Sequence, residues 1–272
     1  ARNAFVSPEM NNDFVLNLRN EHVFSSELGY QYSGSWLRAN LSAYYNRLTH
    51  VTEWQNFFFD DVNSFTYVSM TNIKKSLYGV ELGLDFKLTN FLNFKTLATW
   101  QEAKNVNNAD VVYMNSTKST FYKDVVYNYG MREANTPLSA YSAILSFHKG
   151  GWYIDLAGNY YDRIYLSYSP NQRYGSTLKT MGRTLGGIVE GYYNPAPQAK
   201  GHGGFMLDAS IGKSIYIGRK SLSINLMVTN ILNNQKIVSG GYEYGRSSYT
   251  VNKKTGKIKD RAYDFGKNPK LY

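Results

Sequence analysis

The chain has 272 residues, of which 43% are hydrophobic, 18% charged and 16% aromatic, a composition too apolar for a disordered tail. It has no Cys, which excludes a disulfide framework, a thiolate zinc site and a Cys nucleophile, and no apolar run approaches the roughly 18 residues that a membrane-spanning helix needs. The formal net charge of +10 lies almost entirely in residues 213–272, where twelve Lys and Arg accompany three Asp and Glu.

Eight segments alternate two kinds of side chain with a period of two, as in strands whose faces meet different surroundings. In residues 36–46, for example, Leu41 and Tyr45 share one face, and Arg38 and Asn40 share the other. No helical period fits these segments, so we predict an all-β chain of antiparallel strands. The segments cover residues 24–32, 36–46, 78–88, 92–100, 141–147, 152–160, 205–211 and 222–228.

The connections between these strands alternate between short and long. Tight turns that contain Gly or Asn are predicted at residues 33–35, 89–91, 149–151 and 218–220. Long loops are predicted at about residues 53–66, 103–137, 169–203 and 231–268. Short turns at one end of a sheet and long loops at the other are typical of outer-membrane β-barrels.

Aromatic residues mark both ends of the predicted strands. Trp36 and Trp152 lie beside short turns, whereas Tyr45, Trp100 and Tyr160 lie farther along their strands. Two aromatic belts about one bilayer thickness apart predict that one strand face touches lipid hydrocarbon. The other face would line a wet lumen. A soluble β-sandwich, whose core the aromatic side chains would fill, is the alternative.

Four short motifs follow one another along the chain. They are Leu18-Arg19-Asn20-Glu21 with Ser26-Glu27-Leu28-Gly29, then Tyr78-Gly79-Val80-Glu81-Leu82, then Thr136-Pro137, and last Val228-Thr229-Asn230-Ile231-Leu232-Asn233. In this order they resemble landmarks of TonB-dependent outer-membrane receptors, and the chain is similar to the C-terminal part of such a receptor's barrel. The Tyr- and Asn-rich style is similar to that of members from Bacteroidetes.

The resemblance implies an antiparallel transmembrane β-barrel segment, with about eight strands of a barrel that has about 22. Residues 1–20 would be an extracellular loop leading into the barrel, residues 21–232 the strands with their loops, and residues 233–272 a basic extracellular loop before a truncated last strand. The family's plug, TonB-binding box and first strands have no counterpart here. The start in polar sequence suits a processed chain or a fragment, and we expect a fragment that ends early in a ninth strand.

The sequence contains no constellation that suggests catalysis or a cofactor. His22, His50, His148 and His202 are scattered without metal-ligand spacing. Charged residues on the predicted polar faces are interpreted as lumen residues and not as paired catalytic carboxylates. Residues 60–63 contain two Asp but lack the rest of an EF-hand pattern. We predict no enzymatic activity, no cofactor and no bound metal.

The resemblance implies energy-coupled import of a scarce nutrient, such as a glycan, a peptide or a siderophore, across the bacterial outer membrane. The implied partners are TonB, acting through a missing N-terminal region, the imported ligand, outer-membrane lipids with lipopolysaccharide, and a surface lipoprotein, but no nucleic acid. The Asp-Pro-Glu stretch common in SusC-like glycan importers has no counterpart, which leaves the glycan and the lipoprotein open. A passive porin or adhesin barrel and a secreted carbohydrate-binding β-sandwich are the alternative functions.

Aromatic residues in the predicted loops are the candidate ligand contacts, because Tyr and Trp rings offer a large contact area at low entropy cost and stack on flat ligand groups. Two arginines are candidates for binding anionic ligand groups. The candidates are Trp54, Phe57, Tyr113, Tyr127, Tyr129, Tyr165, Tyr168, Arg173, Tyr192, Tyr193, Tyr242, Tyr244 and Arg246.

Overall fold

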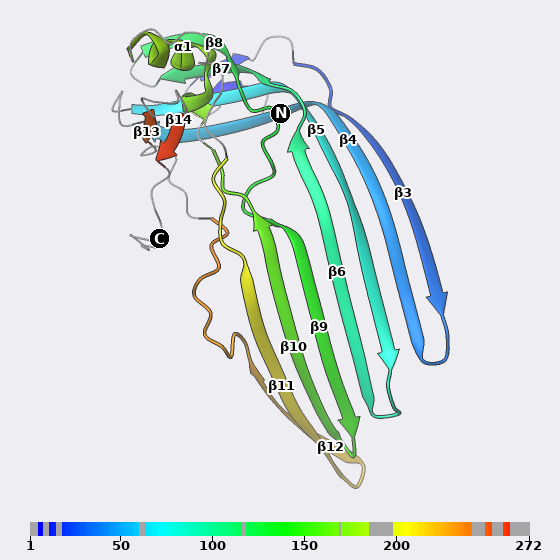
Figure 1. Ribbon diagram of the computed structural model, residues 1–272. Coiled ribbons are helices and arrows are strands. Elements are labelled where there is room, and N and C mark those ends of the chain that lie inside the picture. Colours follow the sequence, from blue (N-terminus) through cyan, green and yellow to red (C-terminus); the bar gives the residue numbers. More distant parts are fainter. Residues whose placement is uncertain are drawn as a thin grey trace.

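The part of the chain that the structure describes folds mainly into antiparallel strands (Figure 1). The computed structural model describes residues 5–7, 11–14, 18–59, 64–115, 118–168, 170–184, 198–240, 248–251 and 258–261. Its elements are β1 (Phe5–Ser7), β2 (Asn11–Phe14), β3 (His22–Ser33), β4 (Leu37–Phe59), β5 (Ser64–Lys87), β6 (Leu92–Asn105), β7 (Ala109–Asn115), β8 (Lys118–Val126), β9 (Pro137–Lys149), β10 (Trp152–Ile164), η3 (Pro170–Arg173), α1 (Gly175–Thr184), β11 (Gly204–Ile217), β12 (Lys220–Val228), β13 (Ser248–Val251) and β14 (Ile258–Arg261). Within these ranges, neither helix has the length and apolarity to cross a lipid bilayer.

Most of the strands belong to one ten-stranded sheet. Eight of them follow the order β12-β11-β10-β9-β6-β5-β4-β3, and the β7–β8 hairpin pairs with β5. Each predicted segment falls on one of the eight strands, with only Trp36 and Leu88 one residue outside, although the observed strands extend beyond the predicted segments, by more than ten residues in β4 and β5. Each predicted tight turn joins two paired neighbours. Both predictions are therefore confirmed. We call the end with these turns the turn end and the opposite end the loop end.

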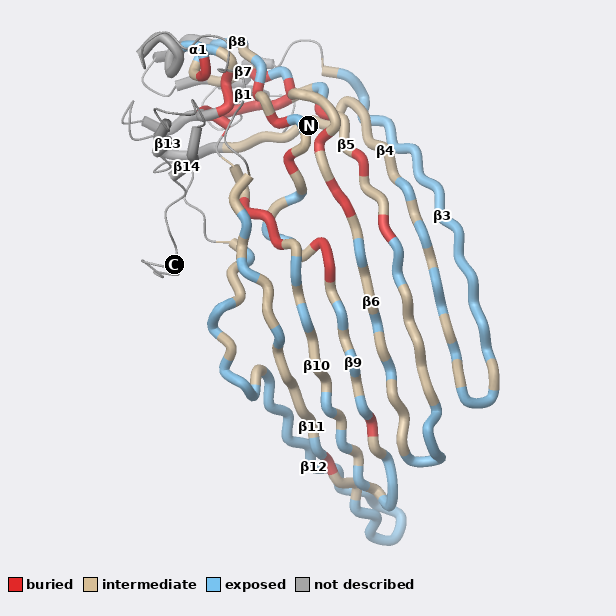
Figure 2. The backbone as a smooth tube through the Cα atoms, viewed as in Figure 1, coloured by how far each residue is buried: buried red, intermediate tan, exposed pale blue. Residues whose placement is uncertain are grey.

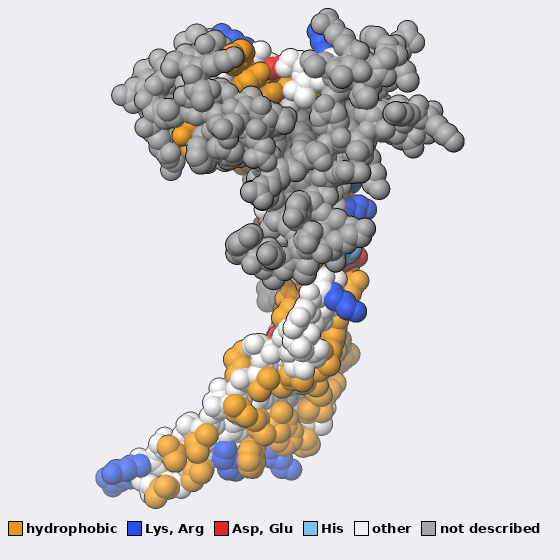
Figure 3. Space-filling view, turned by 90° about the vertical axis from the view of Figure 1, so that its left-hand side faces the viewer, with side chains coloured by type: hydrophobic (Ala, Val, Ile, Leu, Met, Phe, Trp, Pro, Cys, Tyr) orange, Lys and Arg blue, Asp and Glu red, His pale blue; other side chains and the backbone are white. Residues whose placement is uncertain are grey.

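The eight strands form a single layer whose two faces differ in chemistry. Leu41 pairs with Leu82 and Leu145 pairs with Leu156, so these side chains share one face, which we call the apolar face. Buried residues gather at the loop end, whereas the strands toward the turn end are mostly intermediate or exposed (Figure 2). Hydrophobic side chains gather over this lower part, with Lys and Arg at the turn end (Figure 3). Among the described residues no second sheet covers the apolar face, unlike the layers of a β-sandwich.

The opposite face, called the polar face, carries side chains that hydrogen-bond across neighbouring strands. Tyr44 donates a hydrogen bond to the side-chain oxygen of Gln101 over 3.0 Å. Ser142 donates to Asn159 over 2.8 Å, and Asn159 donates to Asp208 over 3.1 Å. This face therefore suits contact with water or another polar surface.

Two rows of aromatic side chains cross the apolar face. In the row nearer the loop end, Tyr45 pairs with Tyr78, and Tyr160 pairs with Tyr141. The row nearer the turn end consists of Trp36, Phe86, Phe94, Phe91, Phe147 and Trp152. Eight residues separate Tyr78 from Phe86 along β5, which is about 26 Å at about 3.3 Å per residue. This separation is close to the height of about 25 Å of the apolar band of outer-membrane barrels.

Paired irregularities bend β4 and β5 near the loop end. His50 and Asn72 have positive φ values of 58° and 56°, and the β4–β5 register shifts between Leu48 and Glu53. Bulges of this kind bend a strand and increase its twist. Beyond this point β4 and β5 run across the loop end of the sheet, together with β7 and β8 (Figure 1).

The same bulges shift the alternation of side chains between the two faces. Ile73, on the turn-end side of Asn72, packs in one cluster with Val68 and Met70 on the other side of it. An uninterrupted strand would place Ile73 and Met70 on opposite faces. Apolar side chains above the bulges therefore lie on the polar-face side, where Tyr174, between η3 and α1, packs against them.

The prediction of loops at residues 53–66 and 103–137 is wrong, because most of these residues lie in strands. β4 continues to Phe59, β5 begins at Ser64, and β7 and β8 occupy the second stretch. Both stretches are rich in Val, Tyr, Phe and Thr, which favour strands. The predicted loop at residues 169–203 contains η3 and α1.

Gly151→Ala should destabilise the barrel more than Gly150→Ala, although both glycines belong to one turn. Both have positive φ, 59° at Gly150 and 78° at Gly151, as a tight turn between β9 and β10 requires. A Cβ on Gly151 would lie 2.5 Å from the carbonyl oxygen of Ser214, whereas a Cβ on Gly150 meets nothing within 4 Å. The left-handed backbone costs either Ala about 1–2 kcal/mol. The clash should add about 1 kcal/mol for Gly151→Ala.

Urea unfolding of the two variants in the same lipid would measure this difference. Equal losses of stability would show that Ser214 does not restrict the turn.

Candidate functional site

A pocket of about 430 Å³ lies at the loop end between β4, β5 and residues 131–135. We call it the polar-face pocket because of Lys75 in β5. This residue lies three positions from the apolar-face residue Tyr78, and an odd separation along a strand places the two side chains on opposite faces. Most of its lining is hydrogen-bonding. Glu53, Gln55, Lys75, Glu133, Asn135 and Tyr168 are among the residues that line it.

Lys75 is the central charge of this pocket. Its Nζ lies 2.5 Å from a carboxylate oxygen of Glu53 and 3.0 Å from one of Glu133. Glu53 belongs to β4, whereas Glu133 belongs to the segment after β8. Lys75 therefore joins three parts of the chain, and the two carboxylates compensate its charge.

A buried carboxylate lies beside the pocket where the sheet opens. Pairing between β6 and β9 ends at Trp100 and Ser139. Past that point Glu102, whose side chain is only 6% exposed, accepts a hydrogen bond of 2.6 Å from Nε of Arg132 and a second one from Arg163. This ion cluster occupies the opening and ties residues 131–135 to β6 and β10.

Residues 131–135 add a short strand-like segment to the sheet. The backbone N–H of Glu133 donates to the carbonyl of Ala103 in β6 over 2.9 Å. The backbone N–H of Asn135 donates to the carbonyl of Tyr165 over 2.8 Å. Because both edges of the segment are bonded, Glu133 and Asn135 are held in fixed positions on the pocket wall.

Three of the sequence candidates lie together beside the pocket. Tyr168 lines it and accepts a hydrogen bond from Asn128 over 3.0 Å. The guanidinium of Arg173 lies 5.4 Å from the centre of the Tyr168 ring and donates to the backbone carbonyl of Tyr127 over 3.3 Å. Burial raises the pKa of Tyr168 to about 12, so its hydroxyl is neutral at physiological pH.

Trp54 lies on the opposite side of the same strands. Trp54 borders the pocket, and the centre of its ring lies 6.2 Å from that of Tyr67. Tyr168 instead packs against the cluster that contains Val68. Because Tyr67 and Val68 are consecutive strand residues, their side chains point to opposite faces. The rings of Trp54 and Tyr168 therefore pack on opposite faces of these strands.

The remaining described candidates lie in different surroundings, away from the polar-face pocket. The ring of Tyr113 stacks 4.5 Å from that of buried Tyr174. Tyr165 is buried beneath the guanidinium of Arg132, which lies 4.7 Å from its ring centre. Tyr129 is 69% exposed. None of these three lines the polar-face pocket.

Six candidates lie wholly or partly outside what the structure describes. Phe57 belongs to β4, but its side chain is not among those described. The others are Tyr192, Tyr193, Tyr242, Tyr244 and Arg246. Their contact with a ligand stays a prediction.

Sequence reasoning missed the charged residues that organise the pocket, Glu53, Lys75 and Glu133. Extending the alternation of residues 78–88 backwards would place Lys75 on the polar face, which is a signal that the sequence contains. Its pairing with Glu133 has no such signal, because 58 positions separate the two residues.

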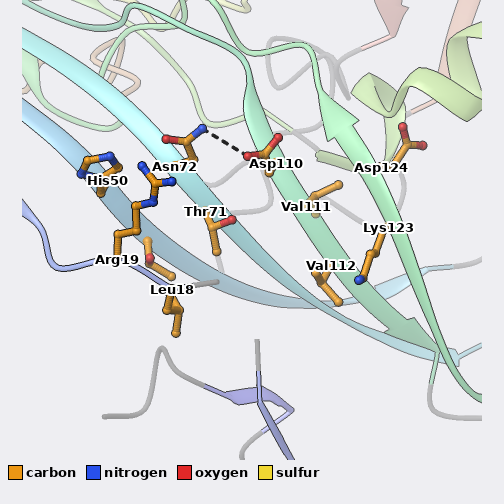
Figure 4. A pocket seen from close by; sticks show the side chains of 11 residues that line it. Leu18, Arg19, His50, Thr71, Asn72, Asp110, Val111, Val112, Lys123 and Asp124 are labelled. Atoms are coloured by element: carbon orange, nitrogen blue, oxygen red, sulfur yellow. Dashed lines mark hydrogen bonds between the residues drawn. The ribbon is translucent and has the colours of Figure 1, made fainter. Parts of the chain in front are cut away.

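A second pocket, of about 390 Å³, is drawn in Figure 4. It lies beside the cluster in which Leu18, Trp54 and Val112 pack against Tyr67. It shares Leu18 with that cluster, and Asn72 donates a hydrogen bond to Asp110 over 3.2 Å across it. Asp124, also in its lining, accepts a bond of 3.0 Å from the backbone N–H of Ser176 in the first turn of α1. Asn72, Asp110 and Asp124 thus already serve strand and helix contacts. In the part of the chain that the structure describes, no three His, Cys, Asp or Glu side chains gather as a metal site.

The family model described as "TonB dependent receptor-like, beta-barrel" matches residues 2–231. The chain belongs to this family. The resemblance carried by the four sequence motifs is thereby confirmed, together with the prediction of an antiparallel barrel segment. None of the curated proteins compared with the chain matches it.

A solved structure similar to this TonB-dependent receptor chain is that of the copper transporter OprC. The two share 15% sequence identity with a TM-score of 0.52. The match covers 84% of this chain and 27% of OprC. At this identity the likeness shows the fold alone, and the chain spans about a quarter of the length of that transporter. The single-layered sheet is therefore one part of the wall of a TonB-dependent receptor barrel.

Proposed function

We propose that the chain forms part of the wall of an outer-membrane importer, which takes up a scarce nutrient with energy transduced by TonB. The two-faced sheet supports this function most directly. Its apolar face, bounded by two aromatic rows, suits a lipid bilayer, and its hydrogen-bonded polar face suits a wet lumen. TonB would act through a region outside these residues, and outer-membrane lipids with lipopolysaccharide would surround the barrel.

We propose that the polar-face pocket contacts the imported ligand on its way into the lumen. Two carboxylates compensate Lys75, so the pocket offers hydrogen bonds without a large excess of either charge. Asn135, Gln55 and the neutral hydroxyl of Tyr168 suit a ligand rich in hydroxyl or amide groups, such as a glycan or a peptide. A surface lipoprotein is proposed as a further partner at the loop end.

Whole-cell uptake tests the energy requirement. Cells that carry the complete receptor would be offered fluorescent oligosaccharides, fluorescent oligopeptides and ferric siderophores, with receptor-deficient cells as the control. We expect receptor-dependent uptake of one of these probes, and we expect an uncoupler of the proton gradient to abolish it. Uptake that continues with the gradient collapsed would support a passive porin and would remove active import.

Lys75→Gln should weaken uptake of the accepted probe by about tenfold, because hydrogen bonds to charged groups contribute about 1.5–3 kcal/mol. The matched control is Lys95→Gln, a polar-face lysine whose Nζ lies 3.9 Å from Asp85 near the turn end. We expect the control to import at the native rate. Concentration-dependent uptake, normalised to receptor at the cell surface, would measure both. Equal rates in the two variants would exclude a role of the pocket in import.

A further inference from the structure

Three side chains stand side by side at the turn end of the apolar face. Trp152, the first residue of β10, pairs with Lys149 of β9 on one side and with Lys213 of β11 on the other. Paired residues of neighbouring strands project from the same face of a sheet. Because strands lie about 4.8 Å apart, the backbones of the two lysines are about 10 Å apart, with the indole between them.

Both ammonium groups rest on aromatic rings of the turn-end row. Nζ of Lys149 lies 4.8 Å from the ring centre of Phe91, and Nζ of Lys213 lies 4.7 Å from that of Trp152. Lys213 also donates a hydrogen bond of 2.7 Å to the backbone carbonyl of Gly150. Contacts of this kind hold a cation in place without neutralising its charge.

No carboxylate among the described residues forms an ion pair with either lysine. Near the turn end, Asp85 and Asp155 lie on the polar face, where Asp85 is 3.9 Å from Lys95 and Asp155 accepts a hydrogen bond from Ser210. Arg219 and Lys220, in the next turn, are exposed and add further positive charge. The turn-end edge of the apolar face thus carries uncompensated positive charge.

We propose that Lys149, Trp152 and Lys213 bind the headgroup of an anionic glycerophospholipid. The site rests on the proposed placement of the apolar face in a bilayer. There the short turns mark the periplasmic leaflet, and lysines at such a boundary keep their charge in the headgroup layer. The acyl chains would lie along the exposed, paired side chains of Ile154 and Ile211.

The charge pattern selects a headgroup with net negative charge. A phosphodiester placed over Trp152 has an ammonium group on either side. A zwitterionic headgroup brings its own cation, which the two lysines and the basic turn would repel. Phosphatidylglycerol carries the phosphodiester without a compensating amine, so it should be preferred over phosphatidylcholine.

Fluorescence quenching by brominated lipid tests this preference. The full-length receptor is reconstituted into phosphatidylcholine bilayers that contain either brominated phosphatidylglycerol or brominated phosphatidylcholine. Subtracting the signal of Trp152→Phe isolates the quenching at Trp152. A lysine near the bilayer surface favours an anionic lipid by a factor of about five. We therefore expect at least a fivefold preference for phosphatidylglycerol in the native protein and a ratio near one in Lys149→Gln/Lys213→Gln.

The matched control is Lys87→Gln/Lys95→Gln, which removes the same charge from the polar face at the same end of the strands. This variant should keep the native preference. Equal losses in both double variants, or no preference in a native barrel that has inserted, would overturn the lipid site alone. Heat-modifiable electrophoretic mobility reports insertion. A native barrel that inserts into neither bilayer would count against the proposed membrane function and would remove the site with it.

Discussion

Leu41→Arg should destabilise the barrel by about 2–4 kcal/mol in a lipid bilayer, the cost measured for arginine near the midplane of the lipid face of such barrels. Leu41 lies on the apolar face between the two aromatic rows and is 44% exposed. Its direct neighbour in β5 is Leu82, which offers no charge to compensate an arginine. Urea unfolding in liposomes, followed by tryptophan fluorescence, would measure the loss.

The control is Asn40→Arg, one residue away on the polar face. There the guanidinium would point into the wet lumen beside other polar side chains. We expect its unfolding free energy to stay within about 0.5 kcal/mol of the native value, as for most surface substitutions. If both variants unfold alike, the assignment of the two faces is incorrect.

Glu102→Gln should destabilise the barrel by about 2–3 kcal/mol, because it leaves two arginines without their shared carboxylate. The side chain of Glu102 is 6% exposed, whereas those of Arg132 and Arg163 are 33% and 24% exposed. Water can partly solvate the two arginines, so the loss should be smaller than for a fully buried cluster. The same unfolding assay would measure it, and faster proteolysis within residues 131–135 should accompany it.

Glu133→Gln provides the comparison for this ion cluster. The Glu133 side chain is 53% exposed, and Lys75 keeps its contact with Glu53 when Glu133 is neutral. Exposed ion pairs contribute about 1 kcal/mol or less, so this variant should be nearly native. A loss as large as that of Glu102→Gln would mean that burial does not distinguish the two carboxylates.

The lower part of the sheet could be predicted because its determinants are local. Alternation along residues 78–88 depends on neighbouring positions, and Gly150 and Gly151 specify a tight turn by themselves. Between the two aromatic rows, the alternation of side chains continues without interruption along each strand, so the sequence alone predicts these parts of the strands. The two aromatic rows follow from the same alternation.

The loop end could not be predicted in the same way, because its determinants are distant in sequence. A positive φ at His50 and Asn72 interrupts the alternation, so the strands beyond these residues resemble loops. The polar-face pocket depends on Glu133, which reaches Lys75 only because residues 131–135 insert beside β6. Selecting candidate ligand contacts by their aromatic rings includes Trp54, whose ring packs against Tyr67 on the face opposite to that of Lys75.

The phase shift at His50 and Asn72 has an evolutionary consequence. It lets the same two strands carry apolar side chains on one face before the bulges and on the other face beyond them, with the change confined to a few residues. Substitutions beyond the bulges can therefore change the loop end without altering the alternation of side chains in the strands below it. Exchanging residues 51–71 between related receptors should therefore leave the strands between the two aromatic rows intact.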